Sequence, residues 1–457
     1  MLLSVLLALV INQITSPSLP EGIWETQGYG YIFDVQKSNI TVYDELGDES
    51  LSDEVLTPTQ FHANFGDWED ISAGQPRKTW RLQTSGMRVK ALASLPAACV
   101  HPLAHDARPL VNFDYFWQTF KAHYAFFAQH GVNWDAVRAE LRPKAATLPD
   151  DGDVFPILAD MVARLRDTHV GLFAGNRSFG VRKYPRWVED SPGGPVFIDD
   201  HYMLNGLRAY MTGANTPLIR PAENVGNGQV LYGRIKAVSA AKDAVRPSSE
   251  YGYIALFGMK EFDKTEGRDT PDDESVNSAR LAMKQAISAL RGVKGVIIDL
   301  RYNGGGGDAV AVAIAGFFTD RPVKAYSKRV YYNGKAGEPY QVVVRPENGE
   351  RLSVPIAILT SDFTVSAAEV GVLALKALPR CIQIGQPTRG SFSDRLHKVM
   401  PNGWTISLSN EIYADKKGRV FEVCGAPPDI ATTMPSPKSP DELRYWRDIA
   451  IALKALH

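Results

Sequence analysis

One strand-to-loop transition constrains the fold of this chain more than any other feature. The apolar strand Gly295-Val-Ile-Ile-Asp-Leu-Arg301 runs into four consecutive glycines, Gly304 to Gly307, and a helix is expected from Asp308 to Phe318. Continuous apolar strands of this kind are typical of parallel sheets that helices cover on both faces. The segment therefore predicts an α/β layered domain with a glycine loop at the carboxyl end of a strand.

Strands and helices continue to alternate on both sides of this segment. The strand from Val354 to Thr360 leads through a polar turn into a helix expected from Ser366 to Leu378, and a last helix is expected from Pro440 to Leu456. We assign residues 251–457 to the α/β layered domain. Functional groups are expected at the carboxyl ends of its strands, where helix N-termini converge.

The N-terminal half has a different organisation. Residues 21–105 carry short alternating segments such as Tyr29-Gly-Tyr-Ile-Phe-Asp-Val and predict a small β domain. Residues 110–175 carry apolar side chains at helical spacing and predict a domain of three helices. Residues 176–250, rich in Pro, Gly and Asn, are expected to form bridging strands and loops.

The first residues raise the question of export. Met1 to Val10 is an apolar run with the length of a signal-peptide core, but no basic residues precede it. The run is too short to span a bilayer. We expect residues 1–20 to be a signal or another apolar N-terminal segment; export is favoured, and a cytoplasmic protein with a buried first strand or helix is the alternative.

Charge and cysteine content limit the classes of partner. The chain of 457 residues has a net charge of −1 and no long run of like charges, which argues against nucleic acid and acidic membranes as partners. Cys99, Cys381 and Cys424 are too few for a disulfide framework. Cys99, His101 and His105 have metal-ligand spacing without a fourth ligand, so no metal is expected.

Ser366 stands where a nucleophile would be expected. It lies between a buried strand and a helix, where free backbone N–H groups and the helix dipole favour developing negative charge. The competing interpretation is an ordinary N-cap serine. The glycine loop offers similar N–H groups, and it lacks both the Gly-Lys-Ser/Thr ending and the Gly-x-Gly-x-x-Gly spacing of phosphate loops, so it favours an oxyanion over phosphate.

Four ordered motifs carry a resemblance to a known family. They are Asp299-Leu-Arg-Tyr-Asn-Gly-Gly-Gly-Gly-Asp308, Ser366-Ala-Ala-Glu369, Ile384-Gly-Gln-Pro-Thr-Arg-Gly390 and Gly418-Arg-Val-Phe-Glu-Val-Cys-Gly-Ala-Pro-Pro-Asp429. In this order they resemble the C-terminal-processing and tricorn superfamily of serine peptidases, over roughly residues 110–435. The resemblance implies a ClpP/crotonase-like layered catalytic domain, a peptide or protein substrate and no cofactor. The carboxylate-binding loop of a PDZ domain, found in the processing branch, is missing.

One position separates this chain from the lysine-dependent branch. Ser391 stands where the processing proteases have a catalytic lysine, so the resemblance to the tricorn-like branch implies that His169 is the base. The pKa of an unperturbed histidine, about 6.5, suits this role. His397, within the same α/β domain as Ser366, is the reserve candidate.

The resemblance also implies the groups around this pair. Thr168 and Glu422 match the hydroxyl and glutamate that orient the histidine, with two alternatives: Glu422 binds Arg419 on the surface, or Asp167 orients the ring. The expected oxyanion donors are the N–H of Ala367 and one N–H from Gly304 or Gly305, with Arg301 and Asn303 bracing the loop.

The resulting prediction is acyl transfer through a Ser366 acyl-enzyme. Two other functions stay open at this point. The superfamily also resembles retinoid-binding repeats, in which the same scaffold holds apolar ligands, and crotonase-type acyl-CoA enzymes share the layered fold and the oxyanion hole. The sequence leaves the cleavage specificity and the oligomeric state undetermined.

Overall fold

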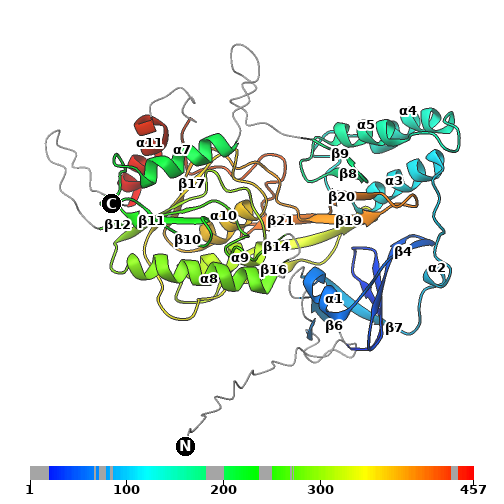
Figure 1. Cartoon of the computed structure of the whole chain (residues 1–457), viewed down its shortest axis with the longest axis horizontal. Coiled ribbons are helices and arrows are strands. Elements are labelled where there is room, and N and C mark those ends of the chain that lie inside the picture. The colour runs from blue at the N-terminus through cyan, green and yellow to red at the C-terminus, as the bar shows by residue number, and fades with distance from the viewer. Residues whose placement is uncertain are drawn as a thin grey trace, which may run out of the picture.

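The computed structural model describes residues 20–65, 68–70, 79–82, 86–181, 200–235, 250–267, 270, 272–433 and 441–456. Figure 1 shows an N-terminal sheet and a group of helices at one end of the molecule and a larger α/β body at the other. Residues 1–19 lie outside the described residues, so export stays a prediction. Within the described part of the chain, no helix is long and apolar enough to cross a membrane.

The N-terminal strands form one antiparallel sheet in the order β4-β3-β2-β1-β7-β6-β5. In β3, alternate residues are buried, which is the pattern of a strand with one face on a core. Helix α1 (Pro58–Phe65) covers that face. The ring of its Phe61 packs edge-on against the ring of Phe33 in β2, with 5.0 Å between the ring centroids. The strands are β1 (Gly22–Thr26), β2 (Tyr31–Val35), β3 (Ile40–Leu46), β4 (Glu49–Leu56), β5 (Trp68–Asp70), β6 (Thr79–Leu82) and β7 (Arg88–Leu92), followed by the short helix α2 (Ala97–Val100).

Three helices follow, as the apolar spacing predicts: α3 (Pro109–His123), α4 (Trp134–Ala146) and α5 (Phe155–Leu165). The strands after them are β8 (Gly171–Ala174) and β9 (Arg177–Gly180). These strands join β19 (Arg395–Val399) and β20 (Thr405–Ser409) in a sheet of order β19-β20-β8-β9. The chain that follows α5 is therefore fixed by strands from the C-terminal part of the sequence.

The predicted α/β layering is confirmed in the large sheet, whose order is β10-β11-β12-β13-β17-β18-β22. Val296 and Ile298 of β13 pack towards α8, α9 and α10, whereas Ile297 between them packs towards α7 and α11. Strands β12, β13, β17, β18 and β22 run parallel. The strands are β10 (Glu223–Val225), β11 (Val230–Arg234), β12 (Tyr251–Leu256), β13 (Gly295–Asp299), β17 (Ile356–Thr360), β18 (Cys381–Gly385) and β22 (Ile430–Ala431), and the helices are α7 (Asp200–Thr212), α8 (Asp272–Ala289), α9 (Asp308–Gly316), α10 (Ala367–Ala377) and α11 (Asp441–Leu456).

Helix α7 corrects the prediction for residues 176–250, where only strands and loops were expected. Residues 182–199 and 236–249 of that segment lie outside the described part of the chain. Met203 and Leu207 of this helix pack in the core on the α11 side of the large sheet, the side to which Ile297 points. Gly206, inside the helix, is a weak helix former, and its position against Tyr445 of α11 leaves no room for a side chain.

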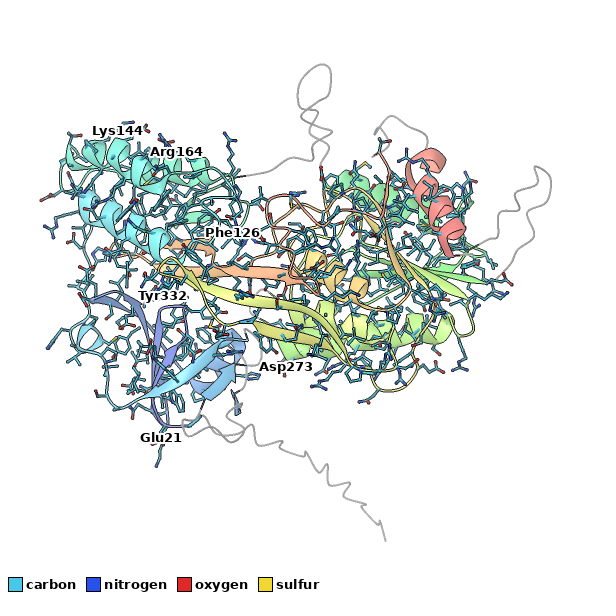
Figure 2. The ribbon with its side chains drawn as sticks, turned by 180° about the vertical axis from the view of Figure 1, so that it is seen from behind. Glu21, Phe126, Lys144, Arg164, Asp273 and Tyr332 are labelled. Atoms are coloured by element: carbon cyan, nitrogen blue, oxygen red, sulfur yellow. The ribbon has the colours of Figure 1, made fainter. Side chains whose placement is uncertain are left out.

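A smaller sheet links the α/β body to the N-terminal half. Strand β14 (Val323–Tyr332) pairs with β16 (Tyr340–Val344) and β21 (Glu411–Asp415), and its end turns at Asn333-Gly334 into β15 (Lys335–Ala336). Figure 2 shows Tyr332 at the end of this sheet, between the N-terminal strands and the helices. Its ring lies 4.8 Å from that of His123 in α3. The two ends of the molecule are thus joined through packed side chains.

Candidate active site

Ser366 lies at the carboxyl edge of the large sheet, in the turn between β17 and α10. It is the N-cap of α10 rather than its first residue, and its backbone has φ 60° and ψ −131°. A non-glycine residue in such a conformation costs on the order of 1–3 kcal/mol and persists only where its surroundings hold it. An ordinary N-cap serine has extended backbone. The backbone of this turn therefore differs from that of an ordinary N-cap, although Ser366 also forms a capping box with Glu369.

The glycine loop lies directly against this turn. Gly305 has φ +86°, and a Cβ on it would lie 2.7 Å from the Cβ of Ser366 and 2.8 Å from the carbonyl oxygen of Val365. Only glycine fits this approach. The pairing of Asp299 in β13 with Leu359 in β17 explains why two segments about 60 residues apart meet, since parallel neighbours end at the same edge.

Of the two residues expected to brace the loop, Asn303 has a side chain that contacts it, whereas the Arg301 side chain joins the end of β13 to α11. The Arg301 guanidinium is buried and pairs with Asp299 at 2.6 Å and with Asp448 of α11 at 3.2 Å. The Asn303 side chain donates to the carbonyl oxygen of Leu256 at 3.0 Å and accepts the N–H of Gly305 at 2.9 Å.

The backbone N–H groups differ in their availability to an oxyanion. The N–H of Ala367 has no acceptor among the described residues, which leaves it available next to Ser366. The N–H of Gly305 is taken by Asn303, and that of Gly304 points at the carbonyl oxygen of Phe257 at 3.4 Å. The N–H of Gly306 also lacks an acceptor within the described chain, a donor that the sequence could not single out.

His169 is held next to β8 by contacts of its backbone. Its N–H donates to Oδ1 of Asp167 at 2.8 Å, and its carbonyl oxygen accepts the Ser407 hydroxyl at 2.9 Å. Asp167 also accepts the hydroxyl of Tyr124 at 3.0 Å. Asp167 thus fixes the backbone of His169, and no hydrogen bond joins its carboxylate to the ring within the described chain.

The imidazole of His169 is buried, with 5% of the residue exposed. Burial lowers the pKa of His169, while the charge of Asp167 and a hydrogen bond to the backbone of Ser393 partly oppose this shift. The ring is therefore neutral at neutral pH and able to accept a proton. Its Nδ1 has no partner in the described structure, and no hydrogen bond joins the ring to Ser366 there.

Ser391 is the residue that connects the two halves of the site. Its carbonyl oxygen accepts the N–H of Ser366 at 3.1 Å, and its hydroxyl lies 2.9 Å from the hydroxyl of Thr168. The structure therefore joins Thr168 to Ser391 and not to Glu422. Ser391, which stands where the lysine-dependent branch has its lysine, therefore contacts both the segment of Ser366 and the segment of Thr168 and His169.

Two buried carboxylates hold the segment Gly390 to Ser393, which we call the strap. Glu369 accepts the N–H groups of Gly390 at 2.7 Å and Ser391 at 2.8 Å, and also that of Ser366 at 3.1 Å. Glu422 accepts the N–H groups of Phe392 at 2.9 Å and Ser393 at 3.1 Å. Four successive N–H groups are thus fixed by two side chains. The Ser-x-x-Glu motif contains Glu369, but the sequence alone does not indicate that its side chain holds the strap.

The structure contradicts the alternative role of Glu422 as the surface partner of Arg419. Glu422 is buried, and Arg419 pairs instead with Asp415 at 2.7 Å.

Burial raises the pKa of Glu369 to about 7 and that of Glu422 well above its usual range. His397, the reserve base, lies on β19 with an exposed side chain, beyond the strap.

Comparisons with known proteins find relatives for two segments of the chain. Residues 250–432 match the model of Peptidase family S41, and residues 105–163 match that of the Tricorn protease C1 domain. Over these residues the chain is similar to Peptidase family S41 and to the Tricorn protease C1 domain, which agrees with the resemblance carried by the sequence motifs. The first segment contains Ser366 and the strap, whereas the second ends before Thr168 and His169.

Individual relatives are distant. The carboxy-terminal processing protease CtpA of Bacillus subtilis is 28% identical over 155 residues, which are 34% of this chain and 32% of the relative. The chain thus spans about a third of the length of such curated relatives. The crystal structure of a candidate peptidase from Parabacteroides merdae covers 77% of this chain and 97% of its own, with a TM-score of 0.57 and 22% identity. Mature CPAF in complex with lactacystin covers 76% and 97%, with a TM-score of 0.50 and 13% identity. Both structures share the fold.

Proposed function

We propose that the protein is a serine peptidase in which Ser366 is the nucleophile and His169 the general base. The observation that carries this proposal is the strained turn of Ser366, with the free N–H of Ala367 on one side and the glycine loop against it. Such a turn presents a hydroxyl and an oxyanion site to the same carbonyl group.

The reaction would run in two steps. Ser366 Oγ attacks the carbonyl carbon of a peptide bond while His169 takes the hydroxyl proton, and the negative charge forms on the oxygen facing Ala367 N–H. The C–N bond then breaks, and His169 returns the proton to the leaving amine. Water repeats the sequence on the acyl-enzyme and releases the acid. Catalytic hydrogen bonds often tighten only with substrate bound, and we propose that substrate brings His169 within reach of Ser366.

The histidine branch is favoured because the enclosed lysines are engaged elsewhere. Lys328 pairs with Glu411 at 3.0 Å, and Lys398 pairs with Asp44 at 2.5 Å. A lysine base must lose its proton near neutral pH, whereas a paired carboxylate stabilises the protonated amine. Neither lysine fits the role of base. Thr168, through Ser391, would set the position of the base segment, and Glu422 would hold the strap behind it.

A fluorophosphonate probe and labelled casein test this function. The wild-type protein is expected to be labelled at Ser366 and to cleave casein, and Ser366→Ala is expected to lose both properties. A protein that binds apolar ligands or CoA esters but never reacts with the probe would instead be a binding protein or a crotonase-type enzyme. Labelling of the Ser366→Ala variant at the wild-type rate would place the nucleophile elsewhere.

A further inference from the structure

Tyr29 connects the N-terminal sheet to strand β21 by a buried hydrogen bond. It lies in the turn between β1 and β2, is only 3% exposed, and its hydroxyl donates a hydrogen bond to Oε1 of Glu411 in β21. Burial and the charge of Glu411 raise the pKa of Tyr29 well above its usual range, so the phenol stays neutral and donates. The N-terminal sheet precedes both segments that match family models, residues 105–163 and 250–432.

Glu411 collects donors from three directions. Besides Tyr29, the ammonium group of Lys328 lies 3.0 Å from Oε1, and the hydroxyl of Tyr413 lies 2.8 Å from Oε2. Glu411 itself is 2% exposed. A buried carboxylate with several donors has one well-defined position, because losing any donor leaves part of its charge unsatisfied.

Two connections lead from Glu411 to the candidate active site. Its N–H donates to the hydroxyl oxygen of Ser393, the last residue of the strap, whose backbone meets the imidazole of His169. The Tyr413 hydroxyl also lies 2.7 Å from Oδ2 of Asp308, the residue that follows the glycine loop and begins α9. Glu411 therefore contacts the base side through its backbone N–H and the oxyanion side through its carboxylate and Tyr413.

We propose that Tyr29 is a positioning residue of the peptidase, through which the N-terminal β sheet aligns the glycine loop with the strap by way of Glu411. This inference rests on the proposed function. According to this proposal, the N-terminal sheet positions the catalytic segments but supplies no group that touches the substrate.

The variant Tyr29→Phe tests the inference because it keeps the ring and removes the hydroxyl. We expect kcat for labelled casein, counted per probe-reactive Ser366, to fall about tenfold, since small misplacements of catalytic groups cost up to about 10²-fold. KM is expected to stay within about twofold. Counting active sites matters, because a variant that merely folds less well would lose sites and keep kcat per site.

Tyr31→Phe is the matched control. Tyr31 belongs to the same sheet, is also buried, and its hydroxyl donates to the carbonyl oxygen of His397 in β19. We expect its kcat per active site to stay within about twofold of wild type. Equal losses in the two variants would contradict a specific role for Tyr29.

Hydrogen exchange separates this inference from the proposed function. In Tyr29→Phe the amides of residues 304–308 and 392–395 should exchange faster, and in Tyr31→Phe they should not. If the wild-type protein neither reacts with the probe nor cleaves casein, the proposed function fails, and the exchange result still decides whether Tyr29 holds these segments. Unchanged exchange in Tyr29→Phe would overturn the inference.

A double variant tests whether the effect passes through Glu411. The losses in kcat caused by Tyr29→Phe and Glu411→Gln should not add in the combined variant, because both changes weaken the same contact. Additive losses would mean that Tyr29 acts on the site by another route.

Discussion

The two halves of the candidate site are built in different ways. The nucleophile half consists of two neighbouring strand-to-helix turns, one with Ser366 and one with the glycine loop, and the register of β13 and β17 brings them together. The base half consists of Thr168 and His169, which are held by residues more than 200 positions later, Ser391 and Ser407. The nucleophile half is thus specified locally, whereas the base half depends on the assembled molecule.

Of all the variants considered, Ser366→Ala should lose the most peptidase activity, because it removes the nucleophile itself. Peptidase activity should fall on the order of 10⁶-fold, as for the loss of a serine nucleophile that acts as a unit with its base. The fold should be retained, because the turn is also held by backbone contacts to the strap. Casein cleavage and circular dichroism measure the two properties. Substantial residual cleavage would place the nucleophile elsewhere.

His169→Ala should cause a loss of similar size. Adding Ser366→Ala to it should cost little more, because the two residues act in one step. His397→Ala is the matched control and should leave casein cleavage near normal. The base assignment would be wrong if the two histidine variants behaved in the opposite way.

Ser391→Lys addresses the lysine alternative directly. Introduced into His169→Ala, it should not restore activity. A lysine base must lose its positive charge, whereas the buried carboxyl groups of Glu369 and Glu422, which accept hydrogen bonds beside this position, would stabilise the charged amine. Recovery of casein cleavage in the double variant would show that the site still supports a lysine mechanism.

The placement of residues around Ser366 could be predicted from the sequence better than the placement of residues around His169. The strand, the glycines and Ser366 are contiguous motifs whose chemistry follows from their position at helix N-termini. The contact of Thr168 with Ser391, in contrast, depends on how β8 pairs with β20, and no local pattern encodes that pairing. Helix α7 was missed for a related reason, since its stability comes from packing against α11 rather than from its own sequence.

Ser391→Ala should have an intermediate effect. A single hydrogen bond contributes about 0.5–1.5 kcal/mol, so loss of the contact with Thr168 should lower kcat/KM between about twofold and about tenfold. Thr168→Val should have a similar effect, and the double variant should be no worse than the single ones. Additive losses in this cycle would show that the two hydroxyl groups work separately.

The smallest effects concern pH. The pKa of His169 is lowered below the ordinary value of about 6.5, so kcat/KM should fall only as the pH drops below that value. Asp167 raises the pKa of His169 and Arg395 lowers it. Asp167→Asn should therefore move the acid limb to lower pH, and Arg395→Gln should move it to higher pH. Shifts of the same sign would contradict the assignment of this limb to His169.

The central claim is that neutral His169 activates Ser366, and the pH dependence of fluorophosphonate labelling tests it most directly. The second-order rate of labelling at Ser366 needs no knowledge of the natural substrate. The wild-type rate should fall with an ionisation below pH about 6.5, and His169→Ala should label far more slowly and lack that ionisation, whereas any contribution from Glu369, whose pKa is about 7, should be present in both proteins. Labelling of His169→Ala at the wild-type rate and with the wild-type pH profile would contradict the claim.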